Sequence, residues 1–379
     1  MHLVDITMFY AAEGGGVSTY LNAKSQWLAR HSVLRHTIMS PNVDDGGEIP
    51  SLVRVPGVPL PGINGYRMPF SVGAIARRLR AAEPDLIEVG DAGHSAWAAL
   101  RARDRLGIPA VAFYHSDLPR LVQNRFGHAA AQAVCKYLCH LYREFDLVLA
   151  PSRLMVDQLA AMGVQGALHQ PLGIDSEVFH PGRRRGDLRA ELGLAPDARL
   201  LVYAGRFTPD KKLSVLAEAV GRLGRPYHLL MVGAGEEPPP PHPAISVLPF
   251  QRNQRDLARL LAGCDVLVHP GDCETFGLIV LEAMACGLPV VATSGGGVAE
   301  LVDERTGILA QPNCARSLAG AIEAVYRRDL AEAGRHARHK AREYFDWERI
   351  FPQIMRRYSR LLAGRQAAQL ALERVCVTD

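Results

Sequence analysis

The sequence Glu274-Thr-Phe-Gly-Leu-Ile-Val-Leu-Glu282 follows the apolar run Val266-Leu267-Val268 and precedes Ala283-Met284. This order predicts a strand, a loop and a helix that opens at Gly277. The loop carries one carboxylate, and the early turns of the helix carry a second. In parallel α/β sheets, ligands bind at the carboxyl ends of the strands. The free N–H groups of a first helical turn bind phosphate. We therefore expect a ligand site here.

Short apolar runs alternate with helical patterns on both sides of this segment. We expect strands at residues 86–89, 110–113, 147–149, 200–203, 228–232, 266–268 and 289–292. Helices are expected at residues 72–82, 96–106, 152–162, 212–223, 254–261 and 317–327. Continuous apolar strands that alternate with helices predict an α/β fold with parallel sheets covered on both faces.

The alternating series restarts near the middle of the chain. A polar, basic stretch at residues 180–187 follows residues 171–175, and a new strand begins at Leu200, so we place a hinge near residues 172–182. We predict an N-terminal domain of residues 1–174 and a C-terminal domain of residues 175–346. Residues 347–374 are expected to form an amphipathic helix, whose periodicity does not indicate the domain on which it packs.

The composition limits the class of protein. The 379 residues are 48% hydrophobic and carry a formal charge of +4, which favours neither disorder nor a nucleic-acid partner. Seven cysteines form no disulfide framework and indicate reduced thiols; the helical spacing of Cys135, Cys139 and His140 gives only weak support for a metal. We expect no signal peptide before the first strand, and no apolar run approaches the ~18–20 residues that span a bilayer. We expect a protein that is soluble or bound to a membrane surface.

Cations follow another predicted strand, at Arg206 and Lys211. An arginine can fork two oxygens of a diphosphate, and a lysine supplies a point charge. Gly205, and Gly233 after the next strand, permit close approach of the backbone to a ligand. Together with carboxylates that accept hydrogen bonds from sugar hydroxyls, this set suits a nucleotide-sugar.

Neither glycine-rich turn completes the G-x-G-x-x-G fingerprint of dinucleotide-binding proteins. Pro238 and Thr19 stand where the third glycine would be, and no phosphate-binding G-x-x-x-x-G-K-[ST] sequence exists. A nicotinamide dehydrogenase and a P-loop enzyme are therefore poorly supported.

Two features of the first half are candidates for an acceptor site. Gly15 and Gly16 lie between the first strand and a helix, where a sugar ring or another acceptor could approach the main chain. His115 follows the strand at residues 110–113, which makes it a candidate polar contact to a sugar or a proton-transfer group.

These residues, in this order, resemble the retaining GT-B glycosyltransferases of family four. The resemblance covers nearly the whole chain and is most specific at residues 205–211 and at Glu274 and Glu282. It implies two Rossmann-like parallel-sheet domains that face each other across a cleft. The C-terminal domain would bind the nucleotide-sugar and the N-terminal domain the acceptor, with the last helix crossing back to the N-terminal domain.

The resemblance also implies roles for individual residues. No metal is expected, because two cations and a helix terminus could neutralise the leaving diphosphate. Arg206 and Lys211 would hold the diphosphate, the main-chain amides of Phe276, Gly277 and Leu278 would assist, Glu282 would hold the ribose, Glu274 would face hydroxyls of the donor sugar, and His115 would lie near its reactive end.

The segment from Tyr114 to Gly127 resembles the same region of family members that glycosylate lipids. We expect transfer of a hexose-type sugar, with retention, from a UDP- or GDP-sugar to a diacylglycerol-type or related envelope lipid. Arg120 and Arg125 could meet an anionic membrane surface, so we expect a cytoplasmic protein, peripheral on the inner face of the membrane. A soluble, polysaccharide or lipid-linked oligosaccharide acceptor is the alternative, and a nucleotide-sugar sensor is the non-enzyme alternative.

Overall fold

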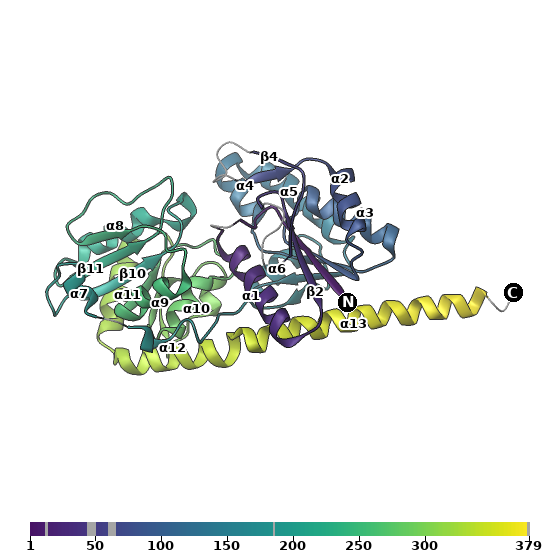
Figure 1. Cartoon of the computed structure of the whole chain (residues 1–379). Coiled ribbons are helices and arrows are strands. Elements are labelled where there is room, and N and C mark those ends of the chain that lie inside the picture. The colour runs from purple at the N-terminus through teal and green to yellow at the C-terminus, as the bar shows by residue number, and fades with distance from the viewer. Residues whose placement is uncertain (12–13, 44–50, 60–65, 185, 377–379) are drawn as a thin grey trace. The chain divides into compact units, whose positions relative to one another are not determined.

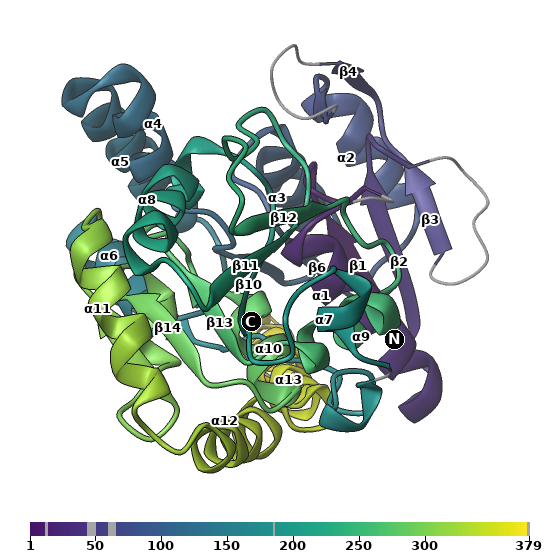
Figure 2. The same ribbon diagram turned by 90° about the vertical axis from the view of Figure 1, so that its left-hand side faces the viewer.

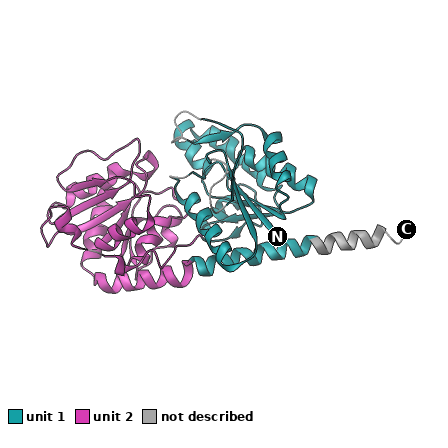
Figure 3. Ribbon diagram, viewed as in Figure 1, with its two compact units in different colours: residues 1–171, 347–379 teal, residues 172–346 magenta. Residues whose placement is uncertain are grey.

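The computed structural model describes residues 1–11, 14–43, 51–59, 66–184 and 186–376, and the side chains up to residue 365. Figure 3 shows the two compact units into which the chain divides. The first unit contains residues 1–171 and 347–379, and the second contains residues 172–346. The sequence placed this boundary at residues 174/175, and the roles that it assigned to the two domains stay predictions.

The first unit is built on a parallel sheet with the strand order β3-β2-β1-β6-β7-β8-β9. Because β2 and β6 flank β1 on opposite sides, the strand order reverses between β1 and β6, which is where parallel sheets bind ligands. The strands are β1 (His2–Ile6), β2 (Arg35–Ser40), β3 (Ser51–Arg54), β6 (Leu86–Val89), β7 (Ala110–Phe113), β8 (Leu147–Ala150) and β9 (Leu168–His169), with an antiparallel pair of β4 (Gly57–Pro59) and β5 (Arg67–Pro69).

Helices cover both faces of this sheet (Figure 1). Side-chain caps define several of their starts: Ser71 accepts a hydrogen bond from the Ala74 amide, and Ser152 accepts one from the Met155 amide. The helices are α1 (Gly16–His31), α2 (Val72–Ala81), α3 (His94–Leu106), α4 (Leu118–Phe126), α5 (His128–Tyr142), α6 (Arg153–Ala161) and α13 (Trp347–Cys376).

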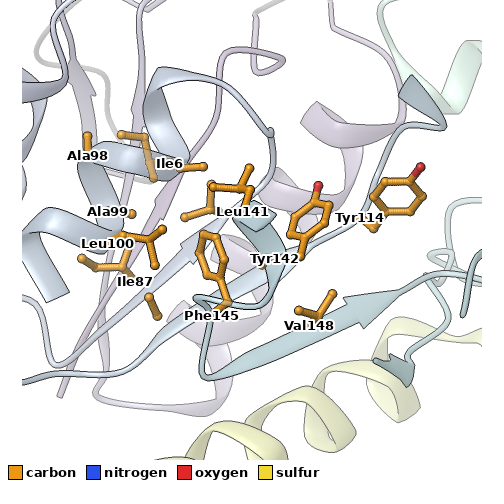
Figure 4. Packing of buried hydrophobic residues seen from close by; sticks show 14 of the residues in the cluster. Ile6, Ile87, Ala98, Ala99, Leu100, Tyr114, Leu141, Tyr142, Phe145 and Val148 are labelled. Atoms are coloured by element: carbon orange, nitrogen blue, oxygen red, sulfur yellow. The ribbon is translucent and has the colours of Figure 1, made fainter. Parts of the chain in front are cut away.

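One face of the first sheet packs into an apolar core with α2, α3, α5 and α6. Alternate strand residues such as Ile6, Ile87 and Val148 meet helix residues such as Leu100 and Leu141 (Figure 4). Successive residues of a strand point to opposite faces. Leu3, Asp5 and Glu88 therefore face the other side, toward α1, and they too are buried.

That second face holds a buried ion cluster. Lys24 of α1 is fully buried, and its ammonium lies 2.9 Å from carboxylate oxygens of both Asp5 and Glu88. Tyr20 and Tyr358 of α13 each place a ring 5.3 Å from the same ammonium. Burial alone would raise the pKa of Asp5, but Lys24 and His36 lower it to about 2. Removal of one member of a buried ion set leaves an unpaired charge and is strongly destabilising. The carboxylates of Asp5 and Glu88 therefore need Lys24 as their partner. The Tyr358 ring of α13 covers the same ammonium.

The second unit is built on a parallel sheet with the strand order β12-β11-β10-β13-β14-β15 (Figure 2). Its order reverses between β10 and β13, which pair at Leu201 with Val266 and at Val202 with Leu267. The strands are β10 (Arg199–Ala204), β11 (Tyr227–Val232), β12 (Ile245–Leu248), β13 (Val266–His269), β14 (Val290–Thr293) and β15 (Gly307–Ala310).

Both faces of the second sheet are buried. Leu201, Leu229 and Val268 pack with α8 and α11, while the alternate residues Val202 and Leu267 are also buried. The helices are α7 (Leu188–Glu191), α8 (Leu213–Leu223), α9 (Gln254–Gly263), α10 (Leu278–Ala285), α11 (Ala315–Tyr326) and α12 (Leu330–Phe345), with short 3₁₀ turns η1 (Pro181–Arg183), η2 (Pro209–Lys211) and η3 (Gly297–Glu300).

The predicted fold class, with two Rossmann-like parallel-sheet domains, is confirmed. Every strand and helix that the sequence predicted is present, and most ends shift by one or two residues. Seven further strands were not predicted, and most of them are short or lie toward the margins of the sheets: β2, β3, β4, β5, β9, β12 and β15. Among the described helices, none is long and apolar enough to cross a lipid bilayer.

Candidate functional site

The reversal point of the second sheet brings together the two loops that the sequence singled out. Residues 205–211 follow β10, and residues 270–277 follow β13, its neighbour in the sheet. Because parallel strands end at the same edge, the cations of the first loop meet the carboxylate of the second. The structure thus assembles Arg206, Lys211 and Glu274 at one place within the second unit.

Gly233 is required by the close approach of two loops. A Cβ at this position would lie 1.9 Å from the carbonyl oxygen of Gly205, so any side chain would push the loops apart. The Gly205 amide donates to Val232 O at 3.0 Å, and the Phe207 amide donates to Ala234 O at 2.8 Å. Both predicted glycines therefore hold the first loop of the site against the end of β11.

Glu274 is the centre of the site's charge arrangement. Its Oε1 lies 2.5 Å from Lys211 Nζ and 3.3 Å from His269 Nε2. Burial would raise the pKa of Glu274, but Lys211 and His269 outweigh burial and hold this pKa well below its usual range. The carboxylate is therefore ionised and remains an acceptor, as a contact to sugar hydroxyls requires.

Lys211 is mostly buried and its charge is already partly matched. Its ammonium also contacts Asp210 Oδ2 at 3.1 Å. Burial would lower the pKa of Lys211, but Glu274 and Asp210 raise it. Lys211 therefore stays protonated between the carboxylates of Asp210 and Glu274.

Arg206 differs from Lys211 in its surroundings. It is exposed, and within the described ranges its guanidinium has no hydrogen-bond or ion-pair partner, while its carbonyl accepts from the Tyr203 hydroxyl at 2.9 Å. An unpaired guanidinium on a fixed main chain is suited to fork two phosphate oxygens.

The amino end of α10 faces this site with unsatisfied main-chain donors. Gly277 adopts φ +101°, and a Cβ there would lie 2.5 Å from Val298 Cγ2, so glycine is needed to start the helix. In the part of the chain that the structure describes, the amides of Gly277 and Leu278 have no hydrogen-bond acceptor. Phe276 anchors the turn through a buried ring, whose centroid lies 6.0 Å from that of Phe345.

Glu282 lies in the second turn of α10 and is 8% exposed. Burial raises the pKa of Glu282 to about 7. No hydrogen bond or ion pair to its carboxylate occurs among the described residues, in contrast to Glu274. A buried carboxylate without a protein partner is costly, and a ligand hydroxyl would provide one.

In the first unit, the ends of β1, β6 and β7 also converge at the point where the strand order reverses. A Cβ on Gly90 would lie 3.1 Å from Thr7 Cβ and 3.4 Å from His115 Cδ2. The α1 helix starts nearby in sequence, with Gly15 as its N-cap and Gly16 as its first residue. These residues form a separate candidate site of the first unit.

His115 is fixed by aromatic packing at this edge. Its ring stacks on Phe113 with centroids 4.3 Å apart and lies 5.4 Å from Tyr20. Burial and, secondarily, the charge of Lys24 lower the pKa of His115 to about 3. The imidazole is therefore neutral at physiological pH, the state in which one ring nitrogen donates a hydrogen bond and the other accepts one.

Two side chains of the second unit's site had no role predicted from the sequence. Asp210 contacts Lys211, and His269 contacts Glu274. His269 ends β13, so its strand-end position was a usable signal. Within the described residues, no cluster of three or more His, Cys, Asp or Glu side chains could hold a metal ion.

Comparisons with known proteins agree with this architecture. A family profile described as Glycosyltransferase Family 4 matches residues 14–178, and one described as Glycosyl transferases group 1 matches residues 198–328. The chain is 32% identical over 260 residues to a GDP-mannose-dependent alpha-mannosyltransferase of Mycobacterium tuberculosis (strain CDC 1551), with 68% of each chain covered.

Two further similarities extend over nearly the whole chain. The first is to a GDP-mannose-dependent alpha-(1-6)-phosphatidylinositol dimannoside mannosyltransferase of M. tuberculosis (strain H37Ra). The two sequences are 28% identical, and the alignment covers 94% of this chain and 95% of the relative. The second is the structure of a sucrose-phosphate synthase from Thermosynechococcus elongatus, with a TM-score of 0.81, 22% identity and coverage of 96% and 100%. The latter similarity shows the fold.

The raised pKa of Glu282 predicts a pH-dependent effect of Glu282→Gln on stability. The folded state binds the Glu282 proton more tightly than the unfolded state, so ionisation costs stability as pH rises from about 4.5 to about 7. The variant avoids this cost. Its advantage in unfolding free energy should grow from under about 1 kcal/mol at pH 5 to about 3 kcal/mol at pH 8.

Urea unfolding, followed by hydrogen exchange of α10 and β13, measures this advantage. The control Glu218→Gln changes an exposed carboxylate of α8 and should shift stability by less than about 0.5 kcal/mol at either pH. An advantage of Glu282→Gln that is constant or falls with pH would contradict the account of this carboxylate.

Proposed function

The chain belongs to the glycosyltransferases of family four, and we propose its function from this membership and from the geometry of the site. It is a hexosyltransferase that uses a nucleotide-sugar donor. The finer proposal is that it transfers the hexose, with retention of anomeric configuration, to a membrane lipid of the diacylglycerol type or a related envelope glycolipid. The arrangement of Arg206, Lys211 and Glu274 at the end of β10 and β13 carries the donor half of this proposal.

The donor is proposed to bind the second unit in a defined orientation. Arg206 and the α10 amides would hold the diphosphate, because they are donors without protein partners. Lys211 would add positive charge beside them. Glu282 would accept from the ribose hydroxyls, and Glu274 would accept from hydroxyls of the transferred sugar.

Bond cleavage would be assisted mainly by stabilisation of the leaving diphosphate. Negative charge develops on that group as the glycosidic bond breaks, and fixed cations and helix amides stabilise developing charge without reorganisation. We propose that these groups suffice without a metal ion. Retention is proposed from the family resemblance, with neutral His115 of the first unit as the group that contacts the sugar near its reactive carbon.

The proposal of a lipid acceptor rests on two observations. The relatives include a phosphatidylinositol dimannoside mannosyltransferase. The first unit also carries α4, a nine-residue helix without a buried residue. Leu121 is 45% exposed and Phe126 is 67% exposed, beside Arg120 and Arg125. Apolar groups flanked by arginines suit the boundary of an anionic bilayer, so we propose action at the inner face of the cytoplasmic membrane.

A soluble or polysaccharide acceptor is the second candidate. It shares the donor site and differs only in the first unit, where α4 would then be an ordinary solvated helix. Family membership sets aside the alternative of a non-enzymatic nucleotide-sugar sensor.

Arg206→Ala should weaken binding of the nucleotide-sugar by about 2 kcal/mol, roughly 30-fold, because a charge-assisted diphosphate contact is lost. Titration calorimetry with the donor that the unmodified protein binds most tightly measures this loss. The matched control Arg222→Ala removes an exposed arginine of α8 that pairs with Glu218 and should leave affinity unchanged. Equal affinities of the Arg206 and Arg222 variants would remove the proposed diphosphate site.

Sugar transfer should continue in excess EDTA, because protein groups would supply the positive charge that the leaving diphosphate needs. Release of nucleoside diphosphate, assayed with and without the chelator, tests this expectation. Complete loss of turnover in EDTA, restored by Mg²⁺ or Mn²⁺, would refute the metal-free proposal.

Binding to anionic vesicles should weaken with added salt and weaken further in the double variant Arg120→Glu, Arg125→Glu. Each basic residue near such a surface contributes about 1 kcal/mol, so reversal of both charges should lower vesicle affinity by at least tenfold. The control Arg101→Glu, Arg105→Glu makes the same charge change on exposed positions of α3. Sedimentation with no vesicle association at low salt, together with turnover of a soluble acceptor, would favour the second candidate.

A further inference from the structure

His269 is a buried side chain of the second unit that the proposed chemistry leaves without a role. It ends β13 and is 2% exposed. Its ring lies 6.3 Å from that of Tyr203, and a Cβ at Gly271 would come within 3.0 Å of its Cε1. The strand and these neighbours therefore fix the ring in one place.

The two ring nitrogens have different environments. Nε2 lies 3.3 Å from Glu274 Oε1. Nδ1 is buried and has no hydrogen-bond partner among the residues that the structure describes. An unpartnered buried nitrogen costs free energy. An apolar side chain at this position would avoid that cost. The contact between Nε2 and Glu274 is therefore the interaction for which a histidine is needed here.

The contact falls on an oxygen that already has a donor. Lys211 Nζ lies 2.5 Å from the same Oε1. Glu274 Oε2 has no hydrogen-bond partner within the described segments, and the Glu274 side chain is 22% exposed to solvent. The main chain of the residue is held as well, since its carbonyl accepts from the Gly297 amide at 2.6 Å. Two donors on one oxygen and a fixed main chain restrict rotation of the carboxylate.

We propose that His269 is a positioning residue: with Lys211 it locks Oε1 of Glu274, so that Oε2 stays available in one orientation for the hydroxyls of the transferred sugar. This inference rests on the proposed function. It separates two roles within the site. Arg206 and the α10 amides recognise the diphosphate, whereas the pair of His269 and Glu274 recognises the sugar.

The test compares affinity for a nucleotide-sugar with affinity for the matching nucleoside diphosphate, which lacks the transferred sugar. Calorimetry on the full chain gives both affinities. His269→Leu should weaken binding of the nucleotide-sugar roughly tenfold, because a hydrogen bond to a charged acceptor is lost. It should leave binding of the nucleoside diphosphate within about twofold, and this second value also reports that the site is folded.

Two amide variants keep the test decisive if His269→Leu does not fold. His269→Gln places a donor near the position of Nε2 and should keep the ratio of the two affinities close to that of the unmodified protein. His269→Asn has a shorter reach and should lower this ratio as His269→Leu does. The control His228→Gln changes a buried histidine of β11, whose Nε2 lies 2.9 Å from Ser246 Oγ, and should not change the ratio.

The outcomes separate the inference from the function on which it rests. Equal losses of both affinities in the Leu and Asn variants, or no loss of either, would overturn the positioning role while the unmodified protein still binds its donor. An unmodified protein that binds the nucleoside diphosphate no more weakly than any nucleotide-sugar, and transfers no sugar, would overturn the proposed function and the inference with it.

Discussion

The parallel pairing of β10 with β13 is the constraint on which the second unit's site depends. These strands are far apart in sequence, and their register places the loops that follow them at one edge of one sheet. Lys211 and Glu274 meet only because of this pairing. The pairing is held by apolar burial, because strand residues on both faces of the sheet, such as Leu201 and Val202, are buried. Stability and site geometry therefore have the same origin, in the apolar strands.

The two units differ in whether their buried and site charges have protein partners. In the first unit, Lys24 is enclosed between Asp5 and Glu88, and every member of the set has a protein partner. In the second unit, Arg206 and Glu282 are left without partners among the described residues. An unpaired guanidinium and an unpaired carboxyl group, beside the ion pair of Lys211 and Glu274, form the arrangement expected of a site that binds a ligand with both phosphates and hydroxyls.

Much of this account could be predicted from the sequence, for physical reasons. The strand–loop–helix at residues 266–285 carries its own signals: a continuous apolar strand, a glycine at the helix start and carboxylates at fixed spacing. The division into two parallel sheets followed from the alternation of apolar strands with amphipathic helices, which is a local property of the sequence. The interactions made by His269 and Asp210 did not follow, because contacts between loops depend on which strands are neighbours. The ion cluster around Lys24 was also missed, since a lysine in an amphipathic helix ordinarily faces solvent.

We propose that the second unit binds the nucleotide-sugar through the loops after β10 and β13. Hydrogen–deuterium exchange of the full chain, with and without a panel of UDP- and GDP-sugars, measures where the donor binds. A donor that is turned over is expected to slow exchange at residues 205–211, 232–235 and 274–282. Turnover of a donor without protection of these segments, and with protection confined to the first unit, would contradict this proposal.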